Sequence, residues 1–291
     1  MRKSSAFSFA AVLFLLGGCA RPERRTVPPE TVPTVEHIAI ASFNVRIFST
    51  NSRTDEELSK IADVLQKYDV IAIQELRDEE VLKRTVEILF RRGFEYGYEI
   101  SDKVGRGVKE RYAFLYRRDK AQVIKQGKLY QEHDDEFIRE PFYATFDAGS
   151  FDFTLITIHV LFGDSVAERR REIQELATVY QMVQDADTVE QDVILVGDFN
   201  FPPTDDGFNN LKALPTMTFL IAPPATTTIT DASLYDNFWF QTQHVGEYAG
   251  EAGVDRFDET MLNNDDDTAS LMVSDHRPIW ARFSVAGVDD D

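Results

Sequence analysis

Cysteine is nearly absent from this chain: its 291 residues include one, Cys19. A single cysteine cannot form an internal disulfide, so none crosslinks the folded protein. The apolar run over residues 6–16 is too short for a comfortable membrane span. Hydrophobic residues make up 43% of the chain, which is enough for the core of one large α/β domain or two small ones. We see no internal repeat.

Basic residues are scarce beside acidic ones: 31 Lys and Arg stand against 50 Asp and Glu, for a formal net charge of -19. A strongly acidic surface argues against tight, metal-free binding to nucleic acid, because phosphate contacts need Lys and Arg. It does not exclude a nuclease whose site is neutralised locally by divalent cations. The alternative is that the charge simply keeps a secreted protein soluble.

The N-terminal residues follow the order of a secretory signal peptide. Arg2 and Lys3 precede the apolar run 6–16, and small residues lead up to Cys19 in the sequence LGGC. The LGGC ending resembles the lipobox of bacterial lipoproteins, which implies lipidation of Cys19 and an N-terminal lipid anchor in the membrane. An ordinary signal peptide whose cleavage site contains a cysteine is the alternative. The resemblance implies a place in the bacterial cell envelope, at the outer membrane or facing the periplasm, or outside the cell.

The composition changes after the cysteine. Residues 20–36 are rich in Pro and Thr and predict an extended tether. From residue 37 onward, the mixture of apolar and polar residues is typical of a globular domain. We therefore predict a signal peptide over 1–19, a tether over 20–36 and one globular domain over 37–287.

Apolar spacing predicts which parts of this domain are strands and which are helices. Strands are predicted over 38–43, 70–73, 112–116, 122–128, 142–146, 151–158, 238–240 and 279–283, and helices over 58–65, 81–90 and 165–183. Strands and helices alternate at first, and a run of consecutive strands follows. This order predicts mixed β-sheets with helices on the outside, an α/β sandwich.

The segment 193–200, with the sequence VILVGDFN, is the starting point for predicting the functional site. Its continuous apolar run predicts a strand that is buried on both faces. Asp198 and Asn200 follow the run, and side chains two apart on an extended segment point the same way. A carboxylate and a carboxamide at the end of a buried strand favour a metal or phosphate site.

Polar residues of catalytic type follow several other predicted strands. They are Asn44 and Arg46, Glu75, His159, and the pair Asp275 and His276. Taken alone, each would be a solvated turn residue or a structural histidine. Together with Asp198 and Asn200 they predict one site where several strands end.

The ordered set of motifs resembles the endonuclease/exonuclease/phosphatase superfamily over nearly all of residues 37–283. The motifs are SFNVRIF around Asn44, IQELRD around Glu75, TIHV around His159, GDFN around Asp198 and SDHRP around His276. The resemblance implies a four-layer α/β/β/α sandwich of two mixed β-sheets flanked by helices. The deoxyribonuclease I family is the more similar branch, through GRGVKERYAFLYR at 105–117, FIREP at 137–141 and LYD at 234–236.

The resemblance implies a site for Mg²⁺ or Mn²⁺ with Glu75 as the principal ligand and with Asn44 and Asp275 nearby. Mg²⁺ prefers oxygen ligands and keeps several waters, which suits these residue types. Asp198 would ligate a second metal ion or accept a proton from the attacking water. Asn200 would hydrogen-bond the phosphate or orient that water.

Two histidine–carboxylate pairs are also implied by the resemblance. Glu110 would orient His159, and Asp236 would orient His276. A carboxylate partner fixes the tautomer and raises the pKa of an imidazole, which suits one histidine to accept a proton and the other to donate one. We expect His276 to be the base and His159 the acid. Without the resemblance, Glu110 is a surface residue in a charged loop and Asp236 is a turn residue.

The expected substrate is double-stranded DNA, cut by a monomer. The residues expected to contact it are Arg46, Arg77, Arg106, Arg139 and Tyr235. Val108 stands where the family has a DNA-contacting tyrosine, which implies a weaker or differently placed grip on the minor groove. A structural Ca²⁺ is possible at Asp134, Asp135 and Glu140, and the acidic run 265–267 is predicted to be a solvated loop.

The family resemblance thus implies a metal-dependent hydrolase of phosphodiesters that cuts DNA with little sequence specificity. Together with the N-terminal signal and the LGGC sequence, it predicts a secreted, lipid-anchored enzyme. A first alternative is a phosphodiesterase or phosphatase acting on phospholipid, inositol phosphate or small nucleotides. The acidic charge and the expected membrane anchor favour it. A second alternative is a binding protein that keeps the fold without catalysis, against which the intact set of site residues counts.

Overall fold

The computed structural model describes residues 36–132, 134, 136–163 and 165–286. The predicted signal peptide, Cys19 and nearly all of the tether lie outside these residues. The described residues belong to one compact unit. Within the described part of the chain, no helix combines the length and the apolar character needed to cross a membrane.

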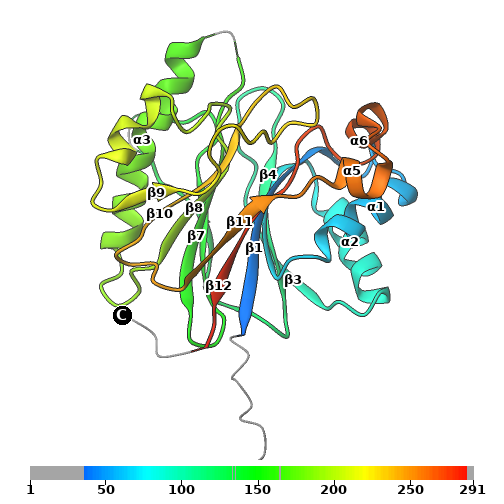
Figure 1. Cartoon of the computed structure of the whole chain (residues 1–291), viewed down its shortest axis with the longest axis horizontal. Helices are drawn as coiled ribbons and strands as arrows, with labels where there is room; N and C mark the ends of the chain where they lie inside the picture. Colours follow the sequence, from blue (N-terminus) through cyan, green and yellow to red (C-terminus); the bar gives the residue numbers. More distant parts are fainter. Residues whose placement is uncertain (1–35, 133, 135, 164, 287–291) are drawn as a thin grey trace, which may run out of the picture. The chain divides into compact units, whose positions relative to one another are not determined.

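Two six-stranded sheets form the centre of the domain (Figure 1). The first sheet has the order β11 (Tyr248–Val254), β12 (Ile279–Ser284), β1 (His37–Phe48), β2 (Val70–Leu76), β4 (Arg111–Arg117) and β3 (Tyr96–Ile100). The second has the order β5 (Gln122–Leu129), β6 (Phe142–Asp147), β7 (Asp152–His159), β8 (Val193–Asp198), β10 (Asp236–Gln241) and β9 (Met217–Phe219). Both sheets are mixed, because β1 and β2 are parallel, as are β7 and β8, while the other neighbours are antiparallel.

Helices cover the outer face of each sheet (Figure 1). Beside the first sheet lie α1 (Asp55–Leu65), α2 (Glu79–Arg91), α5 (Phe257–Leu262) and α6 (Asp266–Met272). Beside the second lie α3 (Val166–Asp185), the short α4 (Asn209–Lys212) and the 3₁₀ helix η1 (Asp206–Phe208).

Three hydrophobic clusters separate these layers. Phe114, Phe146 and Phe153 belong to the cluster between the two sheets, where their rings stack or meet edge to face. A second cluster joins the first sheet to its helices, and a third joins the second sheet to α3. The apolar positions predicted to share one face of the long helix, from Ile173 to Tyr180, are buried in that third cluster. The predicted four-layer α/β/β/α sandwich is therefore confirmed.

The spacing of apolar residues predicted the long strands and helices but not the short ones. Every predicted strand and helix is present, but β3, β9, β11, η1, α4, α5 and α6 were not predicted. The acidic run 265–267 is exposed, as predicted, but it is not a loop, because α6 begins there. Asp265 is its N-cap and accepts a hydrogen bond from the backbone N–H of Thr268 at 3.0 Å.

Candidate active site

A cleft of about 350 Å³ opens where the two sheets meet, and most of the predicted site residues line it. The lining residues are Asn44, Glu75, His159, Phe162, Asp198, Asn200, Thr228, Thr230, Tyr235, Asp275 and His276. Strand pairing places the second sheet's contribution, because His159 and Asp198 are register partners, as are Asp198 and Asp236. The first sheet contributes Asn44 from β1 and Glu75 from β2.

Irregular backbone turns the first sheet's polar side chains into this cleft. The register of β1 against β2 shifts between Asn44 and Phe48, and two residues there take left-handed conformations: Ile47 at φ 45° and Glu75 at φ 60°. The two are joined, since the backbone N–H of Ile47 donates to Oε2 of Glu75 at 2.9 Å. Left-handed backbone is costly for residues other than glycine and clusters at functional sites.

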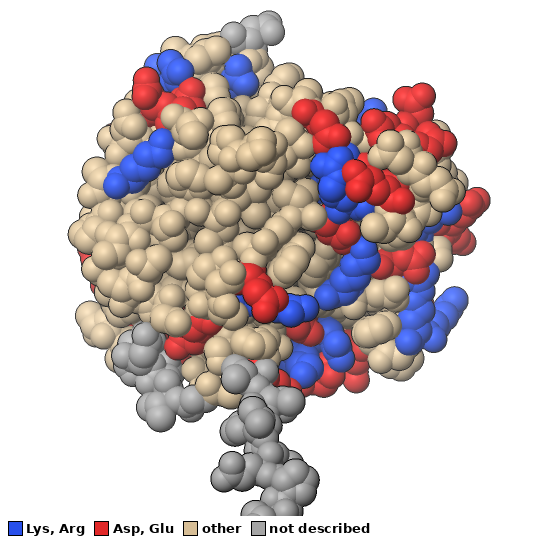
Figure 2. All heavy atoms as spheres, in the orientation of Figure 1, with Lys and Arg blue, Asp and Glu red and all other residues tan. Residues whose placement is uncertain are grey.

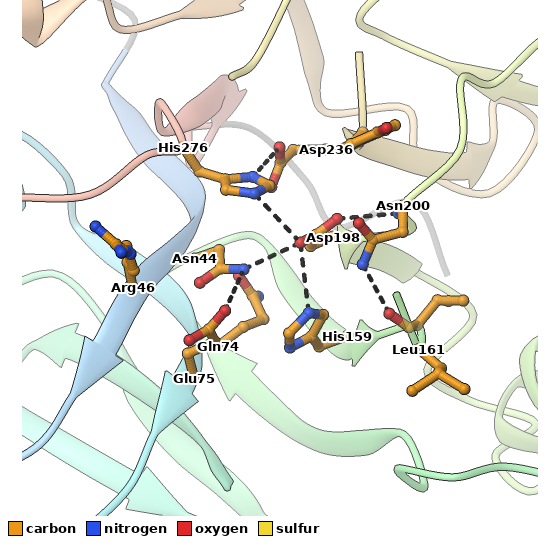
Figure 3. Close-up of polar contacts among 12 residues, drawn as sticks. Asn44, Arg46, Gln74, Glu75, His159, Leu161, Asp198, Asn200, Asp236 and His276 are labelled. Atoms are coloured by element: carbon orange, nitrogen blue, oxygen red, sulfur yellow. Dashed lines mark hydrogen bonds and ion pairs between the residues drawn. The ribbon is translucent and has the colours of Figure 1, made fainter. Parts of the chain in front are cut away.

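Asp198 lies at the centre of the cleft, between the two histidines (Figure 3). Its Oδ2 accepts a hydrogen bond from Nδ2 of Asn44 at 3.0 Å, which links the two sheets. The same oxygen lies 3.5 Å from Nε2 of His159 and 3.6 Å from Nε2 of His276. Burial raises the pKa of the Asp198 carboxyl, but the two imidazoles outweigh this effect and the pKa is lowered. Asp198 is therefore held as a carboxylate that both histidines face.

Asn200 reaches the cleft by a turn and not by strand alternation. Strand β8 ends at Asp198, and Asn200 has a left-handed φ of 53°. Its backbone N–H donates to Oδ1 of Asp198 at 3.0 Å, and its Nδ2 donates to the carbonyl of Val160 at 2.8 Å. The two side chains line one cleft as predicted, but the tight turn after the strand brings them together.

The pair of Glu110 and His159 sits among cations. Nδ1 of His159 is 2.7 Å from Oε1 of Glu110, and Glu110 is fully buried behind the ring. Nε of Arg139 lies 3.3 Å from the same carboxylate and Nη1 of Arg77 lies 3.6 Å from it. Burial raises the pKa of Glu110, but His159 and the two arginines outweigh it, so the pKa is lowered. Burial lowers the pKa of His159, and Glu110 more than restores it, so that pKa is raised.

The pair of Asp236 and His276 sits among anions. Nδ1 of His276 is 2.9 Å from Oδ2 of Asp236, which is also fully buried. Burial raises the pKa of Asp236, and the nearby Asp198 carboxylate raises it further. Burial lowers the pKa of His276, but Asp236 and Asp198 outweigh it and raise that pKa to about 10. Both predicted histidine–carboxylate pairs are thus present as contacts.

The oxygen atoms in the cleft fit a divalent cation. Glu75 and Asp275 line it, and Oδ1 of Asn44 is buried without a hydrogen-bond partner among the described residues. An unpaired amide oxygen beside carboxylates suits a hard cation such as Mg²⁺. Asp198, Asp236 and His276 form a second group, whose ligand atoms lie within 4.8 Å of one another. We favour the first group, because Asp236 is buried behind His276 and hydrogen-bonded to it, whereas Asp275 is open to water.

None of the predicted substrate-binding arginines is among the lining residues of the cleft, but Arg46, Arg77 and Arg139 contact residues of the site. Nε of Arg46 lies 3.7 Å from Oδ2 of Asp275, and Nη2 of Arg77 donates to Oε2 of Glu75 at 3.2 Å. Arg139 donates to the carbonyl of His159 at 3.3 Å, and Arg106 is exposed in the loop after Gly105. Lys and Arg lie beside Asp and Glu on the face in Figure 2, without a continuous basic patch among the residues it colours. On this face, positive charge is therefore balanced locally by neighbouring carboxylates.

Tyr235 does line the cleft, and its ring centroid is 6.5 Å from that of His276. The predicted calcium site at Asp134, Asp135 and Glu140 is not tested by the structure. Asp135 lies outside the described residues, and no group of three or more possible ligands among them includes Asp134 or Glu140.

Sequence reasoning missed the polar groups that join the two sheets beneath the site. Nε2 of Gln74 donates to Oγ of Ser42 at 3.1 Å and to Oγ1 of Thr157 on the opposite sheet at 2.8 Å. All three are buried. A glutamine inside an otherwise apolar strand was the available signal. Phe162, Thr228 and Thr230 were also missed as lining residues.

Comparison with known proteins agrees with this geometry. Residues 41–276 match the model of the Endonuclease/Exonuclease/phosphatase family. A deoxyribonuclease of Thioalkalivibrio sp. (strain K90mix) is 32% identical over 260 residues, covering 84% of this chain and 71% of that protein. Deoxyribonuclease-1 of Bos taurus is 30% identical over 263 residues, covering 83% and 90%.

A solved structure of a mannosyl-6-phosphatase from Bacteroides thetaiotaomicron VPI-5482 has a TM-score of 0.56 to this chain. The likeness covers 84% of this chain and 98% of that one, at 18% sequence identity, and so bears on the fold alone.

Proposed function

The chain belongs to the endonuclease/exonuclease/phosphatase family, and we propose that it is a divalent-metal-dependent DNA endonuclease of low sequence specificity. The observation that carries the proposal is the convergence of two carboxylate-paired histidines on Asp198 in one cleft. The relatives named deoxyribonuclease support DNA as the substrate.

The two histidines, and the residues that hold them and Asp198 in place, have separate roles in hydrolysing a phosphodiester. One histidine takes a proton from the attacking water, and the other gives one to the leaving oxygen. Glu110 and Asp236 hold the two rings by Nδ1, which leaves each Nε2 facing the cleft. Asn200 and Asn44 hold the two oxygens of Asp198, which keeps that carboxylate fixed between the rings.

Glu75, with Oδ1 of Asn44 and with Asp275, would hold Mg²⁺ or Mn²⁺. A cation there would neutralise phosphate charge and make a bound water more acidic. Arg77 ties Glu75 to the backbone of Lys109, because its guanidinium contacts both. This contact fixes the carboxylate while leaving it partly open to solvent.

The deciding experiment is nicking of supercoiled plasmid by the purified chain with Mg²⁺, with Mn²⁺ and with chelator. We expect metal-dependent nicking that Glu75→Ala abolishes. Glu87→Ala is the matched control, since Glu87 pairs with Arg91 on the exposed face of α2, and it should cut as well as the wild type. A folded chain that binds metal but leaves the plasmid supercoiled would refute the proposal.

The assignment of His276 as base and His159 as acid remains our prediction. The raised pKa of His276 counts against it, because a ring that is already protonated cannot accept a proton. A substrate with a p-nitrophenolate leaving group needs no acid, because that group leaves as a stable anion. We therefore expect His159→Asn to lose far less activity on bis(p-nitrophenyl) phosphate than on DNA, and His276→Asn to lose as much on both. The opposite pattern would reverse the two roles.

A phosphatase or phosphodiesterase of small substrates is the second candidate. The acidic charge favours it, and the fold also occurs in the mannosyl-6-phosphatase. A panel of sugar phosphates, inositol phosphates, nucleotides and phospholipids, run beside the plasmid, separates the two. Turnover of one of these above that of DNA would move the assignment to it.

We also propose that the protein is a bacterial envelope lipoprotein anchored through Cys19. The support is the LGGC sequence after a basic start and an apolar run. Labelled palmitate should be incorporated into the wild type and not into Cys19→Ala, and that variant should leave the membrane fraction. Equal labelling of both would refute the anchor.

A further inference from the structure

Phe162 is an exposed aromatic residue on one wall of the cleft. It follows His159 by three positions, in the loop between β7 and α3, and lines the same cleft as His159 and Asn200. Its exposed fraction is 66%, which is high for a phenylalanine. Because Phe162 lines the cleft that holds the reactive groups, its exposed ring is available for contact with a ligand there.

A cation and a second ring support Phe162 from behind. The guanidinium of Arg169, near the start of α3, lies 5.5 Å from the centroid of Phe162 and 4.6 Å from that of Phe201. We call Phe162, Arg169 and Phe201 the aromatic wall. Arg170 anchors it, donating to Asp205 through Nε at 2.9 Å and Nη2 at 2.8 Å, with its guanidinium 6.0 Å from the centroid of Phe201. The wall is therefore built on a fixed helix.

Arg169 differs from Arg170 in having no acidic partner. No carboxylate of the described residues forms an ion pair with it, and its Nε is buried without a hydrogen-bond partner among them. The guanidinium is thus held by the two rings. In a chain with a net charge of -19, an unpaired cation next to the cleft is a site of attraction for a phosphate.

The ring of Phe162 has one face toward Arg169, and its exposure leaves the other open. The chemistry that matches an open aromatic face is another planar π-system. A nucleobase provides one, and every base has such a face regardless of sequence. In a duplex, the neighbouring bases cover the faces of each base. An unpaired base has a free face and is therefore the better partner for Phe162. The cleft volume of about 350 Å³ is that of a small-molecule pocket, which is of the size to hold one nucleotide at a time.

We propose that the aromatic wall is a stacking subsite for an unpaired base next to the scissile phosphate, and that it adapts the enzyme to single-stranded DNA. Phe162 stacks on the base, and Arg169 holds the ring and attracts the backbone. The inference rests on the proposed function, since it needs a DNA phosphate among Asp198, Asn200 and the histidines.

The test compares one labelled oligonucleotide as a single strand and annealed to its complement, cut by the full chain with Mg²⁺. Phe162→Ala removes the stacking contact with one base. We therefore expect it to lower kcat/KM about tenfold on the single strand and less than about twofold on the duplex. Phe162→Trp should keep wild-type cleavage of the single strand. Phe90→Ala is the matched control, because Phe90 is 59% exposed on α2 and contributes nothing to the cleft.

A substrate change makes the assignment specific. In a single strand whose linkages are all phosphorothioates except one, an abasic position beside that linkage removes the stacking base. The wild type should cut this strand about tenfold more slowly, and Phe162→Ala should show no further loss. Testing the abasic position on the 5′ and on the 3′ side shows which base stacks.

The outcomes separate this inference from the function on which it rests. A wild type that cuts neither form of DNA overturns both. A wild type that cuts the duplex, with Phe162→Ala unchanged or equally impaired on both forms, overturns only the stacking subsite. The same holds if the abasic position slows the variant as much as the wild type.

Discussion

The two histidine–carboxylate pairs share one local arrangement and have opposite surroundings. In each, a buried carboxylate contacts Nδ1 of an imidazole whose Nε2 faces Asp198. Arg77 and Arg139 flank Glu110, whereas no arginine among the described residues pairs with Asp236. The pKa of Glu110 is accordingly lowered and that of Asp236 is raised.

The difference teaches that a histidine–carboxylate contact does not by itself define a role. The neighbouring arginines keep Glu110 ionised. This carboxylate in turn holds the ring of His159 in a fixed position. In the other pair, Asp198 and Asp236 draw a proton onto His276, which becomes the main cation among these carboxylates. Separate acid and base roles usually arise where the surroundings shift the pKa values of two titratable groups in different directions.

The largest expected effect comes from removing either imidazole. His159→Asn and His276→Asn should each lower kcat/KM for DNA by about 100- to 10,000-fold, because each removes a proton-transfer group. The double variant should lose little more than the worse single variant, since the two histidines act on one reaction. His244→Asn is the control, because His244 contacts Gln243 away from the cleft. Wild-type cleavage by either single variant would show that its ring transfers no proton.

The two carboxylates should differ in their effect on stability. Glu110→Gln leaves His159 and two arginines without their buried anion, so we expect a loss of about 3 kcal/mol in the free energy of unfolding. Asp236→Asn removes a carboxylate that is repelled by Asp198 and should cost only about 1 kcal/mol. Urea denaturation with chelator present measures both. Equal losses would mean that the arginines do not distinguish the two pairs.

The stability contributed by His276 should depend on pH. Its folded pKa of about 10 lies above the value near 6.5 of an unfolded histidine, so folding favours the protonated ring. This contribution is fully present below about pH 6.5 and is lost as the pH rises toward 10. The stability difference between the wild type and His276→Gln should therefore shrink between these values in urea titrations with chelator. A difference that stays constant across this range would contradict the raised pKa.

The smallest expected effects concern the arginines on the two sides of the cleft. Arg46→Ala and Arg139→Ala should each reduce the slope of log K for DNA against log salt by about 1, through loss of one phosphate contact. Only Arg139→Ala should also change the pH profile of cleavage, because Arg139 contacts Glu110 and Arg46 does not. Arg118→Ala is the control, since its exposed pair with Glu95 lies outside the cleft. An unchanged slope in either cleft variant would remove that arginine from the DNA contacts.

Much of the fold follows from the sequence pattern. Long apolar runs and amphipathic segments mark the buried strands and the covering helices, because these elements bury side chains with a regular period. Short or exposed elements such as β9, β11 and α6 lack such a period and were missed. Their conformation depends on neighbouring strands and on a cap, which spacing does not reveal.

The residue types of the site also follow from the sequence. Asn44, Glu75, His159, Asp198 and His276 are recognisable as an ordered set of motifs, and all five line one cleft. What motifs do not contain is the distance between them, because they lie on different strands of two sheets.

Tertiary structure alone decided how these groups act on one another. Left-handed backbone at Glu75 and Asn200, which strand alternation does not predict, sets the direction of these two side chains. Packing of the two sheets places Asp198 between both histidines and two arginines against Glu110, whereas no arginine of the described residues pairs with Asp236. Charge interactions depend on distance and burial, so the electrostatics of this site and the aromatic wall beside it exist only in the folded chain.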